Sequence, residues 1–600
     1  MCGLFGVVRL GSNSRPIDEQ TRARARRALH TLEHRGPDAW GEWYDERAYI
    51  GHRRLSIIDT STHGLQPMVQ NRSGHVLSFN GEIYNFASLR DELVRDYDFE
   101  SFTDSEVLLH GYNKWGMSGL LERIEGMFAF VIYDPRQRKL HLVRDRVGIK
   151  PLYYGIWSSQ ITFASELKAI VEFSELGDLE HDTTALYDFL TYGYVPTPKS
   201  LYRQVQKLPA ARHLEIDVDT GIRRETAYWS LNDSIDNVEN PGLSEELNHL
   251  LKTSVNEQMV ADVPLGFFLS GGIDSSAVTA AAAYHGARQK TFSIGFDSER
   301  YDETPFAQMV ADRYETDHLR SILSEEASGA IAEDVIRNYD EPFADSSAVP
   351  TYFVSKLAAE SVKVALTGDG GDEVFCGYNW YRRFARAQGR MVRFPQFVQP
   401  LTRYLRRRNG HSERRPISAR LSERLEYDHL LTGFDLYARL MGGLIAREKS
   451  NYRRFWEIPD DYDDYWQYRA FYREDLPLFT RMQYLDFHTY LPDDILTKVD
   501  RASMMVSLET RVPLLSTPII EFGFGISERS RLLNGRLKGV LVASQRNELP
   551  SAILDRPKKG FSVPKQQWSS GLFLKGRTFG ENTLHQMYGE LVPNEAGIAL

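Results

Sequence analysis

The spacing of apolar residues changes once along the chain, and this change divides the sequence into two parts. Up to about residue 170, short apolar runs alternate with turn residues. This pattern predicts a many-stranded, mostly antiparallel arrangement with a few helices. The expected strands are 4–10, 48–58, 75–79, 127–133, 140–145, 151–156 and 160–164, and the expected helices include 86–96 and 105–115.

Beyond about residue 243 the pattern becomes an alternation of helices and strands. Apolar residues between 247 and 259 repeat with helical spacing, and uninterrupted apolar strands are expected at 263–269, 291–296 and 362–366. Strands without polar alternation are typical of a parallel sheet that helices cover on both faces. From residue 378 onward helical patterns dominate.

The length supports more than one domain, because a domain usually holds about 100–200 residues and this chain has 600. We expect a first domain over residues 1–205 and a second over 243–570. The stretch 206–242 between them is rich in turn residues and is predicted to be a linker. The tail over 571–600 carries no motif that indicates a role.

Charge and composition exclude several classes of protein. The 72 Lys and Arg against 82 Asp and Glu give a net charge of −10, which argues against nucleic acid or an anionic membrane as the main partner. No apolar stretch approaches the roughly 18 residues of a membrane span, and the first residues lack the features of a secretion signal. Two cysteines exclude a disulfide scaffold. We therefore expect a soluble, cytoplasmic protein.

Cys2 is the first chemical candidate because of its position. Removal of Met1, which a small second residue permits, would leave a thiol and a free α-amine on one residue. Such an amine has a pKa of about 7.7–8.0 in small peptides and can act as the base for its own thiol. One residue would then supply both nucleophile and base.

Other residues of the first part suit an amide substrate. Asn80 and Gly81 end an expected strand with a side-chain amide and an unhindered backbone N–H, which are donors for a developing oxyanion. Arg54 can bind a carboxylate, and Asp104 can hold an ammonium group. Together they fit a free amino acid that carries a side-chain amide.

Two glycine-rich loops of the second part suit phosphate. SGGIDSS at 270–276 joins a buried strand to a helix, whose N-terminal N–H groups and dipole attract anions. It lacks the lysine of a P-loop. TGDGGDE at 367–373 also follows a strand, so Asp274 and Asp372 can hold a Mg²⁺ ion between the two loops, and the ion would bridge phosphate oxygens.

Sequence blocks in both parts resemble known families. The blocks MCGLFGV, HRGPD (34–38), HRRLSIID (52–59), FNGEIYN (79–85), TDSE (103–106) and RDRVGIKPLYY (144–154) resemble the N-terminal-nucleophile glutaminase domain of class II amidotransferases. SGGIDSS resembles the pyrophosphate loop of ATP pyrophosphatases. Together with TGDGGDE, KVDRASM (498–504), RVPLL (511–515) and RPKKGFSVP (556–564), it resembles the synthetase domain of glutamine-dependent asparagine synthetases.

The resemblance implies a fold and a set of site residues. The implied fold is an α+β N-terminal-nucleophile glutaminase domain of layered antiparallel sheets and helices, followed by an α/β parallel-sheet ATP-pyrophosphatase domain with a helical C-terminal extension. In the first domain it implies that Cys2 is the nucleophile and that Asn80 and Gly81 form the oxyanion hole. The implied glutamine-binding residues are Arg54, Asn80, Glu82 and Asp104.

In the second domain the resemblance implies an ATP site with a metal ion. Asp274 and Asp372 would bind Mg²⁺, Lys558 would contact the phosphates where the adenylate forms, and Asp369 would lie near the activated carboxylate. The implied ATP and pyrophosphate contacts are Phe268, Ser270, Gly271, Gly272, Asp274, Ser275, Ile294 and Gly368.

The implied reaction converts glutamine, aspartate and ATP into asparagine, glutamate, AMP and pyrophosphate, with ammonia carried through a dry internal passage in what the family suggests is a homodimer. Asp369 stands where asparagine-forming relatives often have Glu, and Ser516 where they often have Asp. The alternative is therefore the same chemistry on another carboxylate, such as a cell-wall peptide, a sugar acid or a peptide natural product. A non-catalytic binding protein is disfavoured because both sets of site residues are intact.

Overall fold

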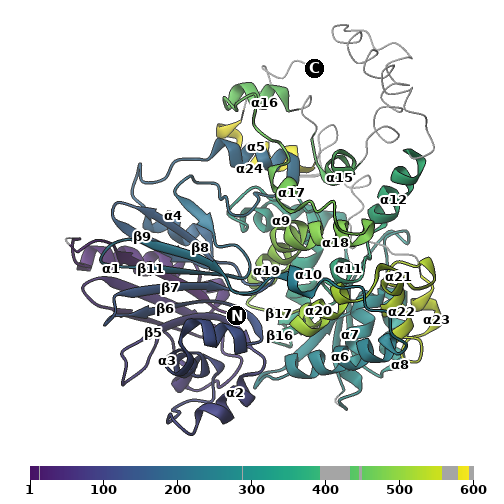
Figure 1. Ribbon diagram of the computed structural model, residues 1–600, viewed down its shortest axis with the longest axis horizontal. Helices are drawn as coiled ribbons and strands as arrows, with labels where there is room; N and C mark the ends of the chain where they lie inside the picture. The colour runs from purple at the N-terminus through teal and green to yellow at the C-terminus, as the bar shows by residue number, and fades with distance from the viewer. Residues whose placement is uncertain (13, 287, 392–432, 445–448, 557–578, 593–600) are drawn as a thin grey trace.

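The computed structural model describes residues 1–12, 14–286, 288–391, 433–444, 449–556 and 579–592. The first part of the chain forms two antiparallel sheets with helices, and the second part forms a parallel sheet beside it (Figure 1). The predicted α+β part followed by an α/β part with a helical extension is confirmed. None of the described helices combines the length and the apolar character that crossing a bilayer requires.

The first antiparallel sheet holds the start of the chain. Its strands are β1 (Gly3–Arg9), β2 (Ala39–Tyr44), β3 (Ala48–Arg54), β8 (Tyr153–Trp157), β9 (Gln160–Ala164) and β10 (Val205–Lys207). They are arranged in the order β10-β8-β9-β1-β3-β2. Helices α1 (Glu19–His30) and α4 (Leu167–Phe173) pack against its outer face, where Phe5 lies in one apolar cluster with Leu29 and Ile170.

The second antiparallel sheet lies against the inner face of the first. Its strands are β4 (Met68–Val69), β5 (Val76–Ile83), β6 (Gly126–Asp134), β7 (Lys139–Arg144), β11 (Arg212–Asp217) and β12 (Arg223–Ala227), in the order β12-β11-β7-β6-β5-β4. Val8 and Ile50 of the first sheet share a core with Val131 and Leu142 of the second. Helices α2 (Phe86–Leu93) and α3 (Asp104–Arg123) cover the opposite face, which gives four layers.

The range 206–242, predicted from the sequence as a linker, contains two strands of the second sheet. β11 pairs with β7 from His213 to Asp217, and β12 pairs with β11 at the sheet edge. Polar and apolar residues alternate in β11 because one of its faces is partly exposed, so no apolar run marks it in the sequence. We therefore propose that the first domain extends to Ala227 and that the connection is shorter than predicted.

The parallel sheet carries helices on both faces, as the sequence predicts. Its strands are β13 (Leu265–Phe268), β14 (Lys290–Phe296), β15 (Asp317–Leu323), β16 (Val364–Leu366) and β17 (Glu509–Arg511), in the order β15-β14-β13-β16-β17. All four pairings are parallel. Helices α6 (Leu243–Gln258) and α7 (Ile273–Ala283) pack in one apolar cluster, whereas α9 (Glu325–Arg337) and α10 (Ala348–Ala359) pack in the cluster on the other face.

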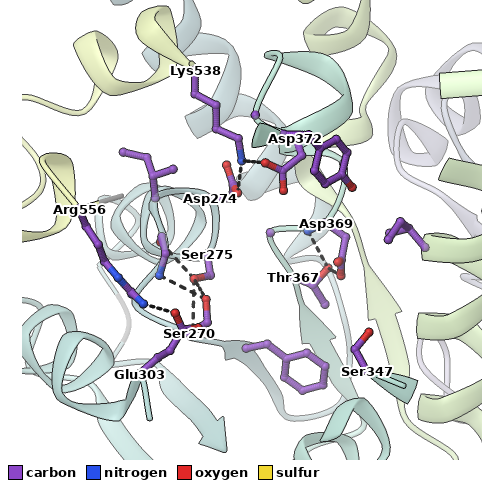
Figure 2. A pocket seen from close by; sticks show the side chains of 18 of the residues that line it. Ser270, Asp274, Ser275, Glu303, Ser347, Thr367, Asp369, Asp372, Lys538 and Arg556 are labelled. Carbon is purple, nitrogen blue, oxygen red and sulfur yellow. Dashed lines mark hydrogen bonds and ion pairs between the residues drawn. The ribbon is translucent and has the colours of Figure 1, made fainter. Parts of the chain in front are cut away.

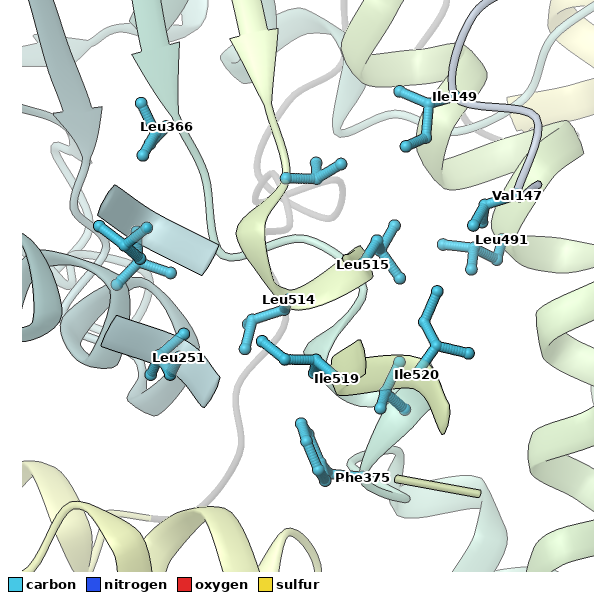
Figure 3. Close-up of a cluster of buried hydrophobic side chains, with 14 of the residues drawn as sticks. Val147, Ile149, Leu251, Leu366, Phe375, Leu491, Leu514, Leu515, Ile519 and Ile520 are labelled. Carbon is cyan, nitrogen blue, oxygen red and sulfur yellow. The ribbon is translucent and has the colours of Figure 1, made fainter. Parts of the chain in front are cut away.

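The helical extension joins the two parts of the molecule. Val147 and Ile149 of the first part lie close to Leu491 and Leu515 of the second in a single apolar cluster (Figure 3). Helix α19 (Thr497–Met504) packs on α10, and α20 (Thr517–Gly525) packs on α6. The C-terminal helix α24 (Phe579–Tyr588) packs on α5 (Thr183–Tyr192).

Candidate active sites

Cys2 lies at the start of β1 and is buried at the boundary between the two parts. Its backbone N–H donates to Asn80 Oδ1 at 2.8 Å, and its sulfur lies 3.9 Å from the carbonyl oxygen of Leu55. Burial raises the pKa of the Cys2 thiol. The thiol is therefore neutral near pH 7 and needs a base before it can attack a substrate.

Asn80 and Gly81 lie next to Cys2 on β5, as the sequence predicts for oxyanion donors. Asn80 is fully buried, and no described residue accepts a hydrogen bond from its Nδ2. A buried donor without a partner is costly, which suits a group that awaits a substrate atom. A Cβ at Gly81 would come within 2.1 Å of the carbonyl oxygen of Met127, so only glycine fits there.

The structure brings the other predicted glutamine-binding residues to the same region. Arg54 is buried at the end of β3, where its guanidinium donates to the carbonyl oxygen of Ser61 at 2.7 Å. Asp104 begins α3 and accepts from the backbone N–H of Ile83 at 2.9 Å. Burial raises the pKa of Asp104 to about 6 and raises the pKa of the nearby Glu82 well above its usual range.

Strand β17 of the second part supplies two charged residues to this region. Glu509 accepts from the Met1 ammonium at 2.7 Å, and Arg511 Nη2 lies 3.5 Å from Glu82 Oε1. Burial would raise the pKa of Glu509, but the Met1 ammonium and Arg511 together lower it to about 2. The first site is thus completed by residues from the other half of the molecule.

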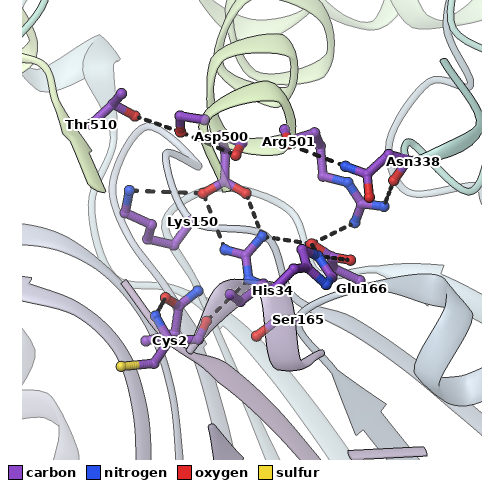
Figure 4. Close-up of polar contacts among 12 residues, drawn as sticks. Cys2, His34, Lys150, Ser165, Glu166, Asn338, Asp500, Arg501 and Thr510 are labelled. Atoms are coloured by element: carbon purple, nitrogen blue, oxygen red, sulfur yellow. Dashed lines mark hydrogen bonds and ion pairs between the residues drawn. The ribbon is translucent and has the colours of Figure 1, made fainter. Parts of the chain in front are cut away.

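A buried ionic network connects Cys2 to helix α19 (Figure 4). Arg35 Nε donates to the Cys2 carbonyl oxygen at 3.1 Å, and Arg35 Nη1 donates to Asp500 and to Glu166 at 2.8 Å each. Arg501 lies 3.3 Å from Glu166. Because these side chains are almost fully buried, the network holds the backbone of Cys2 against the second part.

A second site lies at the carboxyl ends of the parallel strands, where the structure has a cavity of about 790 Å³. Ligands of open parallel sheets bind at this edge. The lining includes the following predicted residues: Phe268, Ser270, Gly272, Asp274, Ser275, Ile294, Gly368, Asp369 and Asp372. Figure 2 shows the loops after β13 and β16 facing each other across it.

The loop after β13 is shaped by contacts among its own hydroxyls. Ser270 Oγ and Ser275 Oγ lie 3.0 Å apart, and the N–H of Gly272 donates to Ser270 Oγ at 3.2 Å. Gly271 has φ 71° and approaches α8 (Thr304–Arg313) so closely that a Cβ would come within 2.5 Å of Ala307 N. The first residues of α7, Ile273 to Ser275, line the cavity, and a helix N-terminus at such a place suits an anion.

Asp274 and Asp372 meet, as predicted, and share one cation. Lys538 Nζ forms an ion pair with Asp274 and lies 2.7 Å from Asp372 Oδ1 (Figure 2). Two carboxylates that can share an ammonium are close enough to share a Mg²⁺ ion, which prefers such oxygen ligands. The two carboxylates have the chemistry that the metal requires, and in this structure the Lys538 ammonium lies between them.

The loop after β16 carries Asp369 and Gly368. Asp369 accepts from the Thr367 hydroxyl at 2.8 Å, and a Cβ at Gly368 would come within 2.5 Å of Ser275 N. Glycine thus allows the two loops to touch. Lys558, predicted to contact the phosphates, lies outside the described residues.

Comparisons with known proteins find a match for each of the two parts of the chain. A glutamine amidotransferase domain model matches residues 1–229, and an asparagine synthase model matches residues 246–578. The glutamine-hydrolyzing asparagine synthetase 1 of Bacillus subtilis is 33% identical, over 95% of this chain and 88% of its own length. The chain belongs to the family of glutamine-hydrolysing asparagine synthetases. It is therefore an enzyme of the ligase class.

Other members of the asparagine synthetase family show similar identity over differing lengths of the chain. A putative glutamine-hydrolyzing asparagine synthetase of Mycobacterium tuberculosis is 33% identical over 95% of this chain and 88% of its own length. The glutamine-hydrolyzing asparagine synthetase B of Escherichia coli is 31% identical over 65% of this chain and 66% of its own length. Both parts of the chain are thus covered by family relatives.

Sequence reasoning missed several residues at the two sites of this asparagine synthetase family member. Arg35 lies in the block HRGPD and Arg511 in the block RVPLL. These blocks indicated the family but did not indicate that the two arginines take part in the first site. Glu509 lies just before RVPLL, and its partner at the amino terminus is 508 positions away. Lys538 has no motif around it, and only the fold brings it to the two aspartates.

Proposed function

We propose that this chain is a glutamine-dependent asparagine synthetase. It would hydrolyse glutamine at Cys2, adenylate aspartate with Mg²⁺ and ATP, and use the released ammonia to displace AMP. The observation that carries this proposal is that one chain holds a buried cysteine at its first site and a separate cavity at the ends of the parallel strands, and that its halves share an apolar cluster.

In the first half, the α-amine of Cys2, freed by removal of Met1, would take the proton of its thiol. The sulfur would then attack the side-chain amide carbon of glutamine, and the Nδ2 of Asn80 would donate to the oxyanion. Breaking the C–N bond releases ammonia as its nitrogen takes up the thiol proton, and leaves a thioester that water hydrolyses to glutamate. Arg54 would bind the glutamine carboxylate, and Asp104 its ammonium group.

In the second half, the loops after β13 and β16 would hold ATP. Ser270, Ser275 and the first N–H groups of α7 would bind the pyrophosphate portion, supported by the helix dipole. Asp274 and Asp372 would hold Mg²⁺, which supplies positive charge to the phosphate oxygens. The aspartate carboxylate would attack the α-phosphorus, the bond to pyrophosphate would break, and ammonia would later displace AMP from the acyl adenylate. Lys558 and Lys538 would balance the charge that builds on the phosphates.

The two halves need a route for ammonia, and the shared apolar cluster supports one. Met127, Val147 and Ile149 on one side and Leu491 and Leu515 on the other are buried in it. An apolar passage excludes the ammonium ion and favours the neutral, nucleophilic form. The chain would thus keep ammonia reactive between the sites.

Substitution of Cys2→Ala tests whether Cys2 serves glutamine hydrolysis and not the ATP-dependent reaction. The full chain is incubated with ATP, Mg²⁺ and aspartate, with either glutamine or ammonium chloride as the nitrogen source, and asparagine and AMP are measured. We expect the variant to lose glutamine-driven synthesis by more than about 1000-fold and to keep ammonia-driven synthesis. Unchanged glutamine-driven synthesis, or loss of both activities in a folded variant, would refute the proposal.

A larger carboxylate acceptor is the second candidate, and the cavity gives one reason for it. Tyr378 and Trp380 line the cavity and stack with ring centroids 3.7 Å apart, and Asp369 is one methylene shorter than Glu. The two candidate acceptors are distinguished by AMP release, which is measured with aspartate and with peptide, sugar-acid and cell-wall carboxylates. Slower turnover of aspartate than of a larger carboxylate would favour this candidate.

We further propose that the enzyme is a cytoplasmic homodimer with domains over 1–227 and 243–570. Light scattering of the purified chain tests the dimer, and cell fractionation tests the location. Limited proteolysis tests the boundary, because cleavage within 228–242 would leave two stable fragments, whereas cleavage within 206–227 would contradict it.

A further inference from the structure

Three residues with metal-binding side chains gather on the α3 face of the second sheet, away from both proposed sites. Glu215 of β11 stands directly opposite His141 of β7, and His213 lies two positions along β11 on the same face. None of the three lines the ATP cavity. The role of this group is therefore independent of the proposed reaction.

The distances within the group suit coordination of one ion. His141 Nδ1 lies 3.0 Å from His213 Nε2 and 3.8 Å from Glu215 Oε2, and the ligand atoms of all three residues lie within 4.8 Å of one another. Tetrahedral Zn²⁺ with bonds of about 2.0–2.1 Å places its ligand atoms about 3.3 Å apart. The 3.0 Å and 3.8 Å separations lie within about 0.5 Å of that value.

Neighbouring side chains orient two of the three ligands, as outer contacts do in known metal centres. The Tyr112 hydroxyl lies 3.0 Å from His141 Nε2, so a proton on Nε2 leaves the lone pair of Nδ1 facing His213. Lys139 donates to Glu215 Oε1 at 3.0 Å, which leaves Oε2 turned toward His141. The contacts of Tyr112 with His141 and of Lys139 with Glu215 thus fix which ligand atoms point inward.

The environment keeps both imidazoles available for a metal and leaves access from solvent. Burial lowers the pKa of His141 to about 3 and that of His213 to about 4, so both are neutral at pH 7. Neutral imidazole is the form that binds metal. His141 is buried, whereas the Glu215 side chain is 33% exposed, so an ion can enter and a water can complete its coordination.

We propose that His141, His213 and Glu215 form a binding site for a first-row transition metal ion of the Zn²⁺ class. Two imidazoles and one carboxylate suit Zn²⁺ better than Mg²⁺, so this site would not compete for the ion at Asp274 and Asp372. A bound ion would tie β11 to β7 and so hold the edge hairpin of β11 and β12 onto the sheet.

Metal counting on the full-length protein tests this site. The protein is stripped with EDTA, dialysed against Zn²⁺ and assayed for bound zinc by atomic emission, and its affinity is measured by calorimetry. We expect wild type to bind one equivalent more than the double variant His213→Gln, Glu215→Gln. The exposed His63→Gln serves as the matched control and should keep the wild-type stoichiometry. Zinc bound at other places on the protein adds equally to each measured stoichiometry, because wild type and the variants differ only at the substituted residues.

Equal zinc binding by wild type, double variant and control would overturn the proposal. Circular dichroism in EDTA shows whether the double variant keeps its fold, since its two altered residues are only partly buried. If the double variant does not fold, X-ray absorption of the zinc-loaded wild type gives an independent answer. Scattering from two imidazoles is expected, and its absence would refute the site.

Discussion

Burial sets the charge of individual side chains at the first site more strongly than their residue type does. Asp104 and Glu82 are carboxyls whose pKa values rise because they are removed from water, whereas Glu509 beside them stays ionised through the Met1 ammonium and Arg511. Removal of Met1 would move the amino-terminal ammonium from Met1 to Cys2 and so change the cation that faces Glu509. Charges in this cluster therefore depend on the processing of the amino terminus.

Glutamine binding should weaken as pH falls through the pKa of Asp104. Only the ionised carboxyl attracts the substrate ammonium, and burial raises its pKa to about 6, so the binding form is lost below that pH. Glutamine affinity, measured by calorimetry on Cys2→Ala to avoid turnover, should fall about tenfold between pH 7 and pH 5. Asp104→Asn should bind weakly at every pH. An identical pH profile in both proteins would contradict this role.

Lys538 should matter for the ATP reaction and not for glutamine hydrolysis. It is buried, has φ 55° although it is not glycine, and bridges Asp274 and Asp372. Lys538→Met should lower ATP–pyrophosphate exchange about 100-fold, because the phosphates lose a fixed cation. Lys538→Arg should restore part of it, since the charge returns with a different shape. Unaltered exchange in Lys538→Met would exclude the role.

At the scale of elements, the second site is built where parallel strands end and loops turn sharply. Gly271 and Gly370 both have positive φ, and a Cβ on either would meet a neighbouring element closer than 3 Å. The same two loops bring Ser275 and Asp274 against Gly368 and Gly371. Close backbone approach, rather than a charged side chain, gives the cavity its shape.

Gly271→Ala should damage the ATP half alone. A Cβ there would come within 2.5 Å of Ala307 N, and alanine at φ 71° adds backbone strain of about 1–2 kcal/mol. We expect the KM for ATP to rise at least about tenfold while glutaminase activity is kept. Gly177→Ala is the matched control, since Gly177 has φ 90° but a Cβ would meet no described atom within 4 Å. Equal effects of the two substitutions would show that strain, not contact, is responsible.

At the scale of the whole molecule, the two halves are held by an apolar cluster and by a buried ionic network. Helix α19 belongs to both sites, because Lys498 and Val499 line the ATP cavity while Asp500 binds Arg35 beside Cys2. A displacement of this helix at one site would also shift the residues that it supplies to the other site. The halves are therefore mechanically linked through a single short helix.

Loss of the buried bridge should affect the whole enzyme more than loss of an exposed one. Asp500→Asn removes one of the two carboxylates that bind the buried Arg35 guanidinium and leaves only Glu166, and breaking such a buried pair costs about 3–5 kcal/mol. Lys363→Gln breaks the partly exposed Lys363–Asp38 pair between the same halves, worth about 0–1 kcal/mol. Differential scanning calorimetry should show a lower unfolding midpoint only for Asp500→Asn, with reduced glutaminase activity. Comparable midpoints in the two variants would argue against the network.

Local patterns were sufficient to predict most of the elements around the sites. Uninterrupted apolar runs predicted β6, β13 and β14, because fully buried strands cannot alternate with polar residues. The hairpin of β11 and β12 was predicted as linker, and β15 was not predicted, because partly exposed edge strands carry polar residues that resemble loops.

The sequence by itself determined the candidate residues for the proposed chemistry wherever one short segment holds them. Cys2, the Asn80–Gly81 pair and the two glycine loops are of this kind, because a turn or a strand end positions neighbouring residues directly. Only the tertiary structure decided that Glu509 and Arg511 reach the first site, that Lys538 joins the two aspartates, and that His141 meets His213. These groups come from segments far apart in the chain, and it is sheet register and helix packing that bring them together.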